Sequence, residues 1–231
     1  MYKEEMPYVS PQYTKDDLLS LCNEEGLSPN SNNYIFERAI AVFRDRIQGR
    51  FLDQIEALSD DIATNGFSIM ALECLLIETL AQFREGLRHT RNCSKSKYTS
   101  FLVEIDSVFG NFPPLSGFAT LNDYHDQVYP DNKPPQNNAL IFYDRIRSGI
   151  LHQAQTSDNS GLTENNQNGI IYWNNGYYMV SVPLFVESVN NYIDRYCDQL
   201  RSSENYILRG NFVNKLRYIC RLNKITWNEY L

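Results

Sequence analysis

The stretch YIFERAIAVFRDRIQGRFLDQIEAL, residues 34–58, decides the fold class. Its apolar side chains recur every three or four residues, which is the spacing of one face of an α-helix, and the pattern holds for about six turns. The residues on this face are Phe36, Ile40, Phe43, Ile47, Phe51, Ile55 and Leu58. The stretch therefore predicts a long amphipathic helix.

The same spacing recurs between breaks along the rest of the chain. It predicts helices over residues 67–89, 98–109, 118–128, 137–155, from Pro183 to about 200, and around 212–220. Residues 156–168 are polar and are predicted to form a loop. Asn174, Asn175 and Gly176 separate two short apolar runs, and Asn-Gly suits a type I′ turn, so we predict a β-hairpin near residues 169–181. We expect a mainly α fold, a helical bundle with this small hairpin.

Residues 1–33 differ in composition from the rest. They are rich in Pro, Ser and Asn around one short helical signal, in which Thr14 is a good N-cap, Asp17 stands three residues on and Gly26 is a stop. We predict a polar N-terminal arm over residues 1–33. No repeat or clear linker divides the remainder, so residues 34–231 are predicted to form a single helical domain.

The charge is strongly segregated along the chain. The 231 residues have a formal net charge of −7, yet residues 84–97 carry +4 and residues 201–224 carry +5, which leaves −16 for the rest. Two sets of basic residues in these segments stand at i, i+4 and i+7, so each is predicted to form one stripe on a helix. The sets are Arg84, Arg88 and Arg91, and Arg217, Arg221 and Lys224. Such stripes can bind the phosphates of RNA, or they can be solvated faces paired with acids elsewhere.

Other classes of site are excluded by composition. The five cysteines are far apart with no Cys-x-x-Cys pair and the chain has only three histidines, so we expect no closed zinc site and neither metal nor cofactor. The best apolar run, residues 69–83, is interrupted by Glu73 and Glu78, and residues 1–10 lack the pattern of a signal peptide. We therefore predict a cytoplasmic protein with no membrane span.

One short motif contains residue types that are suited to catalysis. Arg147, Ser148, Gly149, Ile150, Leu151 and His152 form an Arg-x4-His motif late in the predicted helix of residues 137–155. A second pair, Arg84 and His89, has the same spacing, but Glu85 directly after Arg84 would compete for its guanidinium. We prefer Arg147 and His152, and the choice between the two pairs stays open on the sequence.

The motif resembles the signature of the HEPN superfamily (higher eukaryotes and prokaryotes nucleotide-binding), and its residue types suit the reaction that this resemblance implies, RNA cleavage by the RNA's own 2′-hydroxyl. That reaction removes a proton from the 2′-oxygen, gives one to the leaving 5′-oxygen and stabilises a charged phosphorane. A histidine suits the two proton transfers because imidazole titrates near neutral pH. A guanidinium suits the phosphate because it is a planar fork of donors that stays charged. No metal ion is required.

The superfamily that the motif resembles consists of helical domains, many of which are metal-independent ribonucleases. The resemblance implies that residues 34–231 are a HEPN-like domain, with His152 as general acid and base and Arg147 on the scissile phosphate. By their positions in the sequence, Asp144, one turn before Arg147, and Ser148 are candidates to orient this pair. The alternative for Asp144 is an exposed helix acid that pairs with Arg145 or Arg147. Residues five apart on an ideal helix are about 140° apart around the axis, so we expect that Arg147 and His152 do not share one narrow face and that one helix cannot easily converge them on a phosphate. Nucleases of this family typically pair two such helices across a dimer and form one cleft from both subunits. The resemblance therefore predicts a homodimer.

The resemblance also implies a biological role. It predicts an endoribonuclease that acts as a toxin or antiviral-defence effector, with RNA as substrate and an antitoxin or regulatory protein as partner. In one toxin branch the antitoxin's target is a tyrosine two residues after the histidine, and here that position is Ala154. The alternative is a non-catalytic HEPN-like module that binds RNA or a protein partner.

Overall fold

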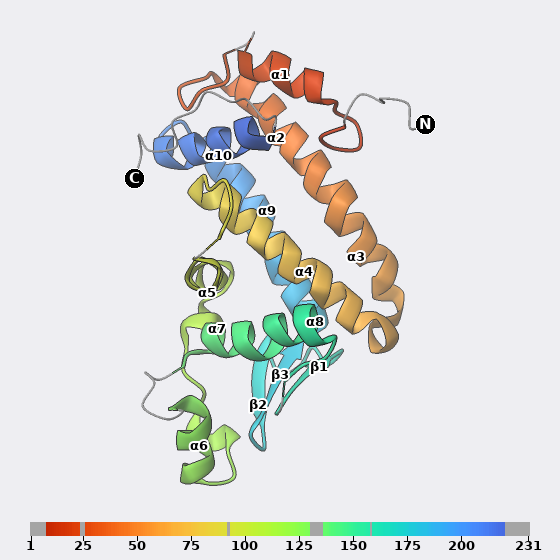
Figure 1. Ribbon diagram of the computed structural model, residues 1–231, viewed down its shortest axis with the longest axis vertical. Helices are drawn as coiled ribbons and strands as arrows, with labels where there is room; N and C mark the ends of the chain where they lie inside the picture. The colour runs from red at the N-terminus through yellow and green to blue at the C-terminus, as the bar shows by residue number, and fades with distance from the viewer. Residues whose placement is uncertain (1–7, 24–25, 92, 130–135, 158, 220–231) are drawn as a thin grey trace. The chain divides into compact units, whose positions relative to one another are not determined.

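The computed structural model describes residues 8–23, 26–91, 93–129, 136–157 and 159–219, and it is mainly helical with one small sheet (Figure 1). The helices are α1 (Lys15–Asn23), α2 (Asn33–Ile47), α3 (Asp53–Leu58), α4 (Ile62–Glu85), α5 (Ser94–Ile105), α6 (Leu121–Val128), α7 (Asn138–Ile141), α8 (Ser148–Gln153), α9 (Val182–Arg201) and α10 (Tyr206–Ile219). The strands are β1 (Ser160–Thr163), β2 (Ile171–Asn174) and β3 (Tyr177–Ser181). The predicted fold class is confirmed.

The long helix predicted over residues 34–58 is confirmed. It begins with α2, whose N-cap Asn32 accepts a hydrogen bond from the Ile35 amide, and continues through a π-helical turn, Gln48–Leu52, into α3. Its apolar face lies inside the protein, because Phe36, Ile40 and Phe43 are each at most 1% exposed.

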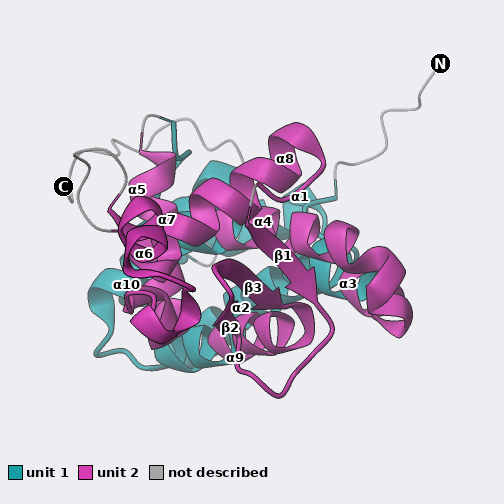
Figure 2. Ribbon diagram, turned by 90° about the horizontal axis from the view of Figure 1, so that it is seen from below, with its two compact units in different colours: residues 1–54, 79–91, 193–231 teal, residues 55–78, 92–192 magenta. Residues whose placement is uncertain are grey.

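The chain divides into two compact units, each built from segments that are distant in the sequence (Figure 2). Unit 1 comprises residues 1–54, 79–91 and 193–231, and unit 2 comprises residues 55–78 and 92–192. The predicted boundary at residue 33 does not coincide with a boundary between units. The predicted polar arm also carries buried side chains, because Leu18 and Leu21 of α1 are each 1% exposed and Leu27 is fully buried.

Aromatic rings form the centre of unit 1. The ring of Phe212 in α10 contacts those of Phe36 and Phe43 in α2 at centroid distances of 5.9 and 5.7 Å, and that of Phe83 at 5.8 Å. Tyr196 of α9 joins them and donates from its hydroxyl to the Phe83 carbonyl (3.2 Å). Helices α2, α4, α9 and α10 thus share one core in this unit.

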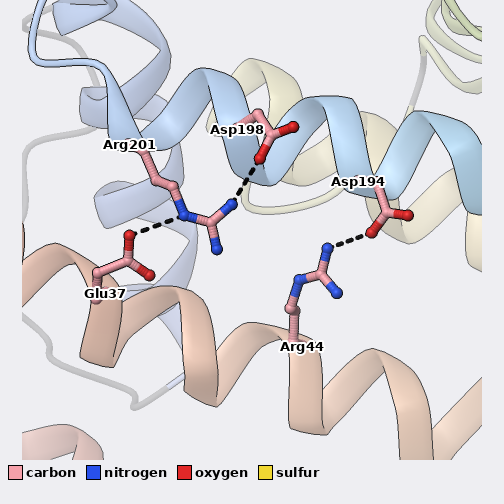
Figure 3. A network of polar contacts seen from close by, with 5 residues as sticks. All are labelled: Glu37, Arg44, Asp194, Asp198 and Arg201. Atoms are coloured by element: carbon pink, nitrogen blue, oxygen red, sulfur yellow. Dashed lines mark hydrogen bonds and ion pairs between the residues drawn. The ribbon is translucent and has the colours of Figure 1, made fainter.

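On the surface of unit 1, ion pairs join α2 to α9 (Figure 3). Arg44 pairs with Asp194. Arg201 donates from Nε to Glu37 (2.8 Å) and from Nη1 to Asp198 (2.7 Å). All five side chains are more than two-fifths exposed, so each pair contributes at most about 1 kcal/mol.

Unit 2 combines helices with the sheet, whose strand order is β1-β3-β2. Strands β2 and β3 are antiparallel around Asn175 and Gly176, whose φ angles of 50° and 81° fit the left-handed turn, so the predicted hairpin is confirmed. The predicted loop over residues 156–168 is wrong in part, because β1 lies within it and pairs with β3 in parallel. The core contains a stack of Phe142 on Phe185, with ring centroids 5.1 Å apart.

Helix α4 differs from its prediction at both ends, since residues 67–89 were expected. It begins at Ile62 and stops at Glu85, because Gly86 takes a φ of +66° and the Leu87 amide bonds back to the Gln82 carbonyl (2.9 Å). By length and composition, one 18-residue window within the helical run of residues 33–85 could cross a membrane, with a mean hydropathy of 1.4. Since 56% of that window is buried inside the protein, it also has the character of a core helix.

Candidate active site

The Arg-x4-His motif lies on a helix of unit 2 that runs from Asn138 to Gln153, close to the predicted bounds of 137–155. Asn137 caps it by accepting from the Leu140 amide (3.0 Å). Between α7 and α8 the helix widens into a π-helical turn, Phe142–Arg147, which closes with a bond from the Ser148 amide to the Tyr143 carbonyl. Such turns occur frequently at functional sites, and this one ends at the arginine of the motif.

The structure brings Arg147 and His152 together. Nη1 of Arg147 lies 3.5 Å from Nε2 of His152. The expectation that one helix cannot easily converge the two side chains is therefore wrong. The angle between two Cα atoms ignores the length of an arginine side chain, and helical side chains lean toward the N-terminus, so His152 leans toward Arg147. The separation of the two residues around the helix axis is therefore no longer a reason to expect a second subunit.

Gly149 fixes the end of this helix. The chain leaves the helix at Ala154, which adopts a left-handed φ of 54°, and then returns across the motif, where the Ser157 amide bonds to the Arg145 carbonyl (2.9 Å). A Cβ atom on Gly149 would lie 2.4 Å from the Gln155 carbonyl oxygen. Only glycine leaves room for this close return, which starts two residues after the exposed His152.

The guanidinium of Arg147 is held from two further directions. Nη2 donates to the Glu78 carboxylate of α4 (3.1 Å), and the guanidinium carbon lies 5.1 Å from the centroid of the Tyr143 ring. The Arg147 side chain is 13% exposed and that of Glu78 is 23% exposed. Among the described residues, Nε of Arg147 finds no acceptor. Glu78 thus orients the guanidinium and balances its charge, while Nη1 faces His152.

Asp144 does not orient Arg147 as predicted. Both of its oxygens accept from Nζ of Lys95 at 2.7 Å, and that ammonium lies 5.7 Å from the Tyr143 ring centroid. Lys95 had entered the prediction only through the charge of residues 84–97. Ser148 takes part through its backbone, which closes the π-helical turn, and its side chain is half-buried. Two cations, Arg147 and Lys95, therefore approach one tyrosine ring.

Unit 2 also contains a buried carboxyl group on α4. Glu73 is fully buried, and neither of its oxygens has a hydrogen-bond partner within the described part of the chain. Burial raises the pKa of its carboxyl well above the ordinary 4.5. Burial also raises the pKa of the Cys74 thiol to about 12, and the charge of Arg147 acts in the opposite direction. Cys74 is therefore protonated and unreactive at neutral pH.

The rival pair, Arg84 and His89, is arranged differently. Arg84 lies in the last turn of α4, whereas His89 follows the turn at Gly86 and is outside the helix. Nδ1 of His89 accepts a hydrogen bond from the Arg91 amide (3.3 Å). The two members of this pair therefore do not share a helix as Arg147 and His152 do.

The first predicted basic stripe is also wrong as a helical stripe. Arg84 is the only one of its three members in a helix, because α4 ends before Arg88 and Arg91, which are both exposed. In the second stripe, Arg217 of α10 donates to the Leu27 carbonyl (3.0 Å), while Arg221 and Lys224 lie outside the described residues. The described members of both sets belong to unit 1.

The other cations of residues 201–219 serve the interior and ion pairs of unit 1. Arg209 is fully buried, donates to the Ser31 carbonyl (2.6 Å) and lies 3.6 Å from the Phe36 ring centroid. Lys215 is 5% exposed and donates to the Arg88 carbonyl (3.1 Å). Burial lowers the pKa of Lys215 to about 8, and the charge of Arg46 acts in the same direction. Much of this segment's positive charge is therefore bound within the protein.

Sequence reasoning missed Glu78, Tyr143 and Gly149. One feature of the sequence indicated Glu78, which is an acid within the apolar stretch of residues 69–83. Its partner, Arg147, lies 69 positions further along the chain. Within the described ranges, no group of three or more His, Cys, Asp or Glu side chains is placed to hold a metal ion. In comparisons with known proteins, no family model, no curated protein and no solved structure matches this chain.

Proposed function

We propose that this protein is a metal-independent endoribonuclease of HEPN type that acts in the cytoplasm as a toxin or antiviral-defence effector. The observation that carries the proposal is the approach of Arg147 Nη1 to His152 Nε2, 3.5 Å apart on one helix. It supports a site in which a proton-transfer group and a phosphate-binding group act on the same phosphodiester.

The surroundings of the pair support a division of roles. At 3.5 Å the contact between the two nitrogens is at the limit of a hydrogen bond, so each is available to a phosphate oxygen. Glu78 accepts a hydrogen bond from the other terminal nitrogen of the guanidinium, Nη2, and acts as a positioning residue. His152 is exposed to solvent. In this proposal His152 removes the 2′-hydroxyl proton and protonates the 5′-oxygen, while Arg147 binds the phosphate.

The homodimer remains part of the proposal and rests on the resemblance.

Replacing Arg147 with alanine tests the proposal. We expect the purified chain to cleave mixed-sequence RNA in EDTA, and Arg147→Ala to lower the rate by about 10²- to 10³-fold, because a preorganised donor to the transition state is lost. Arg147→Lys should recover only part of the activity, since it keeps the charge but not the planar fork. The control is Arg44→Ala, which removes a surface ion pair of unit 1. Equal rates in the Arg147 and Arg44 variants, or no cleavage by the wild type, would contradict the proposal.

A second function is favoured by one observation. Arg147 is paired with Glu78 and largely buried, as a purely structural arginine would be. The alternative is therefore a non-catalytic helical module that binds RNA or a protein partner. In the same assay it predicts RNA that is retained but uncut, with an affinity that falls steeply as salt rises if phosphates are contacted.

A further inference from the structure

A pocket of unit 2 lies close to the motif in the chain. A pocket of about 180 Å³ is formed by the first turns of α4, by Thr156, by β1 with the adjoining Glu164, and by Val182. Thr156 follows His152 by four residues, so the two Cα atoms are at most about 14 Å apart. This is short enough for one bound RNA strand to occupy both places.

The size of the pocket limits its occupant. A cavity of about 150 Å³ holds a benzene ring, whereas sites for drug-sized ligands measure about 300–1,000 Å³. The pocket of about 180 Å³ therefore fits one ring system and not a whole nucleotide. Its walls are apolar at Ile62, Leu162 and Val182, and Phe67, which is 41% exposed, adds an aromatic side chain. Aromatic side chains of this kind stack on unpaired bases.

The polar groups of the pocket define the chemistry of the ring. Thr156 Oγ1 is fixed by donating to the Ser160 carbonyl (2.9 Å), and Thr163 Oγ1 is fixed by accepting from the Asn165 amide (3.1 Å). Glu164 is exposed and adds a carboxylate, which only accepts hydrogen bonds. A ring that presents two neighbouring N–H donors matches the two oxygens of this carboxylate. Guanine does so with N1–H and its exocyclic amine, whereas adenine presents an acceptor at N1.

We infer that this pocket binds a guanine base of the RNA, with Glu164 accepting from the Watson–Crick edge and Phe67 stacking on the ring. The inference rests on the proposed function, because RNA is the ligand that His152 and Arg147 would place beside the pocket. It adds a specificity to that function, namely cleavage within a few nucleotides of a guanosine.

Nucleotide binding tests the inference without any cleavage. The 231-residue chain carrying His152→Ala is titrated with GMP, AMP, CMP and UMP by calorimetry. GMP should bind at least about tenfold more tightly than the others, and Glu164→Gln should weaken GMP binding by about 10- to 100-fold, because a charge-assisted pair of hydrogen bonds is lost. Glu187→Gln is the matched control, since Glu187 is exposed on α9 and is not part of the pocket.

Three results would overturn the inference. They are equal affinities for the four nucleotides, equal effects of the Glu164 and Glu187 variants, and tighter binding of N-acetylarginine amide than of GMP, which would identify a protein side chain as the occupant. Failure here is distinguishable from failure of the proposed function. Cleavage in EDTA without GMP binding would contradict only guanine binding in the pocket. GMP binding without cleavage would contradict only the proposed nuclease activity.

Discussion

Replacing His152 with alanine is expected to lower the rate of RNA cleavage in EDTA by about 10²- to 10⁴-fold, the contribution typical of a positioned general acid or base. The expectation follows from the geometry, in which Nε2 of the exposed His152 lies 3.5 Å from Arg147 Nη1. Because His152 is exposed, its loss should change the free energy of unfolding by at most about 0.5 kcal/mol. A loss of cleavage would then report chemistry and not unfolding.

His125→Ala is the matched control for this prediction. His125 is also exposed and belongs to the same unit, but it lies on α6 against the rings of Tyr124 and Tyr129. Its variant should cleave RNA at the wild-type rate. If the two histidine variants cleave equally well, His152 is not the general acid and base, and Arg147 and His152 would then be a structural pair.

The second large effect concerns stability. Glu73→Leu is expected to raise the free energy of unfolding at neutral pH by about 1–3 kcal/mol, because the wild type buries a carboxyl without a hydrogen-bond partner among the described residues. The gain should depend on pH. Burial raises the pKa of Glu73 in the folded protein above its ordinary 4.5, so above pH 4.5 the unfolded chain loses a proton that the folded chain keeps. Wild-type stability therefore falls as the pH rises from 4.5 to the folded pKa.

Urea unfolding at several pH values checks this prediction. The difference between Glu73→Leu and the wild type should be smallest below pH 4.5 and should grow as the pH rises. Glu73→Gln serves as the control, because it keeps a buried polar group that cannot titrate. It should remove the pH dependence but recover only part of the free energy of unfolding that Glu73→Leu gains. A difference that does not change with pH, or a Glu73→Leu variant less stable than the wild type, would contradict this account of Glu73.

Local patterns in the sequence predicted the local structure well. The apolar period of residues 34–58 reflects a face that is buried, and the predicted cap is present, since Thr14 and Asp17 bond to each other at the start of α1. The hairpin followed from Asn-Gly, whose left-handed angles few other residues adopt. In each case the determining interactions lie within a few residues in the chain.

Features set by distant partners were missed. Strand β1 has the sequence Ser-Gly-Leu-Thr, which shows no alternation, and it is a strand because β3 pairs with it. The apolar spacing of α4 in the sequence continues beyond the end of the helix, because Leu87 fits the apolar face. The helix nevertheless stops before Gly86, where the Asn211 side chain of α10 donates to the Arg84 carbonyl (3.0 Å). Similarly, nothing local distinguishes the buried Arg209 from an arginine that could bind RNA.

The candidate site was predictable in part for the same reason. Arg147 and His152 were found because they are close in the sequence. The side chains that contact Arg147 were not, because Glu78 lies on another helix and the Tyr143 ring contact depends on side-chain packing. Glu78 was visible only as an acid interrupting an apolar stretch, and Asp144 was assigned to the wrong partner because Lys95 lies 49 residues away in the chain. Charge segregation alone could not separate cations on the surface from those bound in the interior.

The chemistry of the product ends tests the central claim most directly. The wild-type chain is incubated in EDTA with an RNA of defined sequence, and the fragments are identified by mass. Attack by the RNA's own 2′-hydroxyl at the Arg147 and His152 site predicts fragments that end in a 2′,3′-cyclic phosphate and begin with a 5′-hydroxyl. Intact RNA, or fragments with 5′-phosphate and 3′-hydroxyl ends, would contradict it.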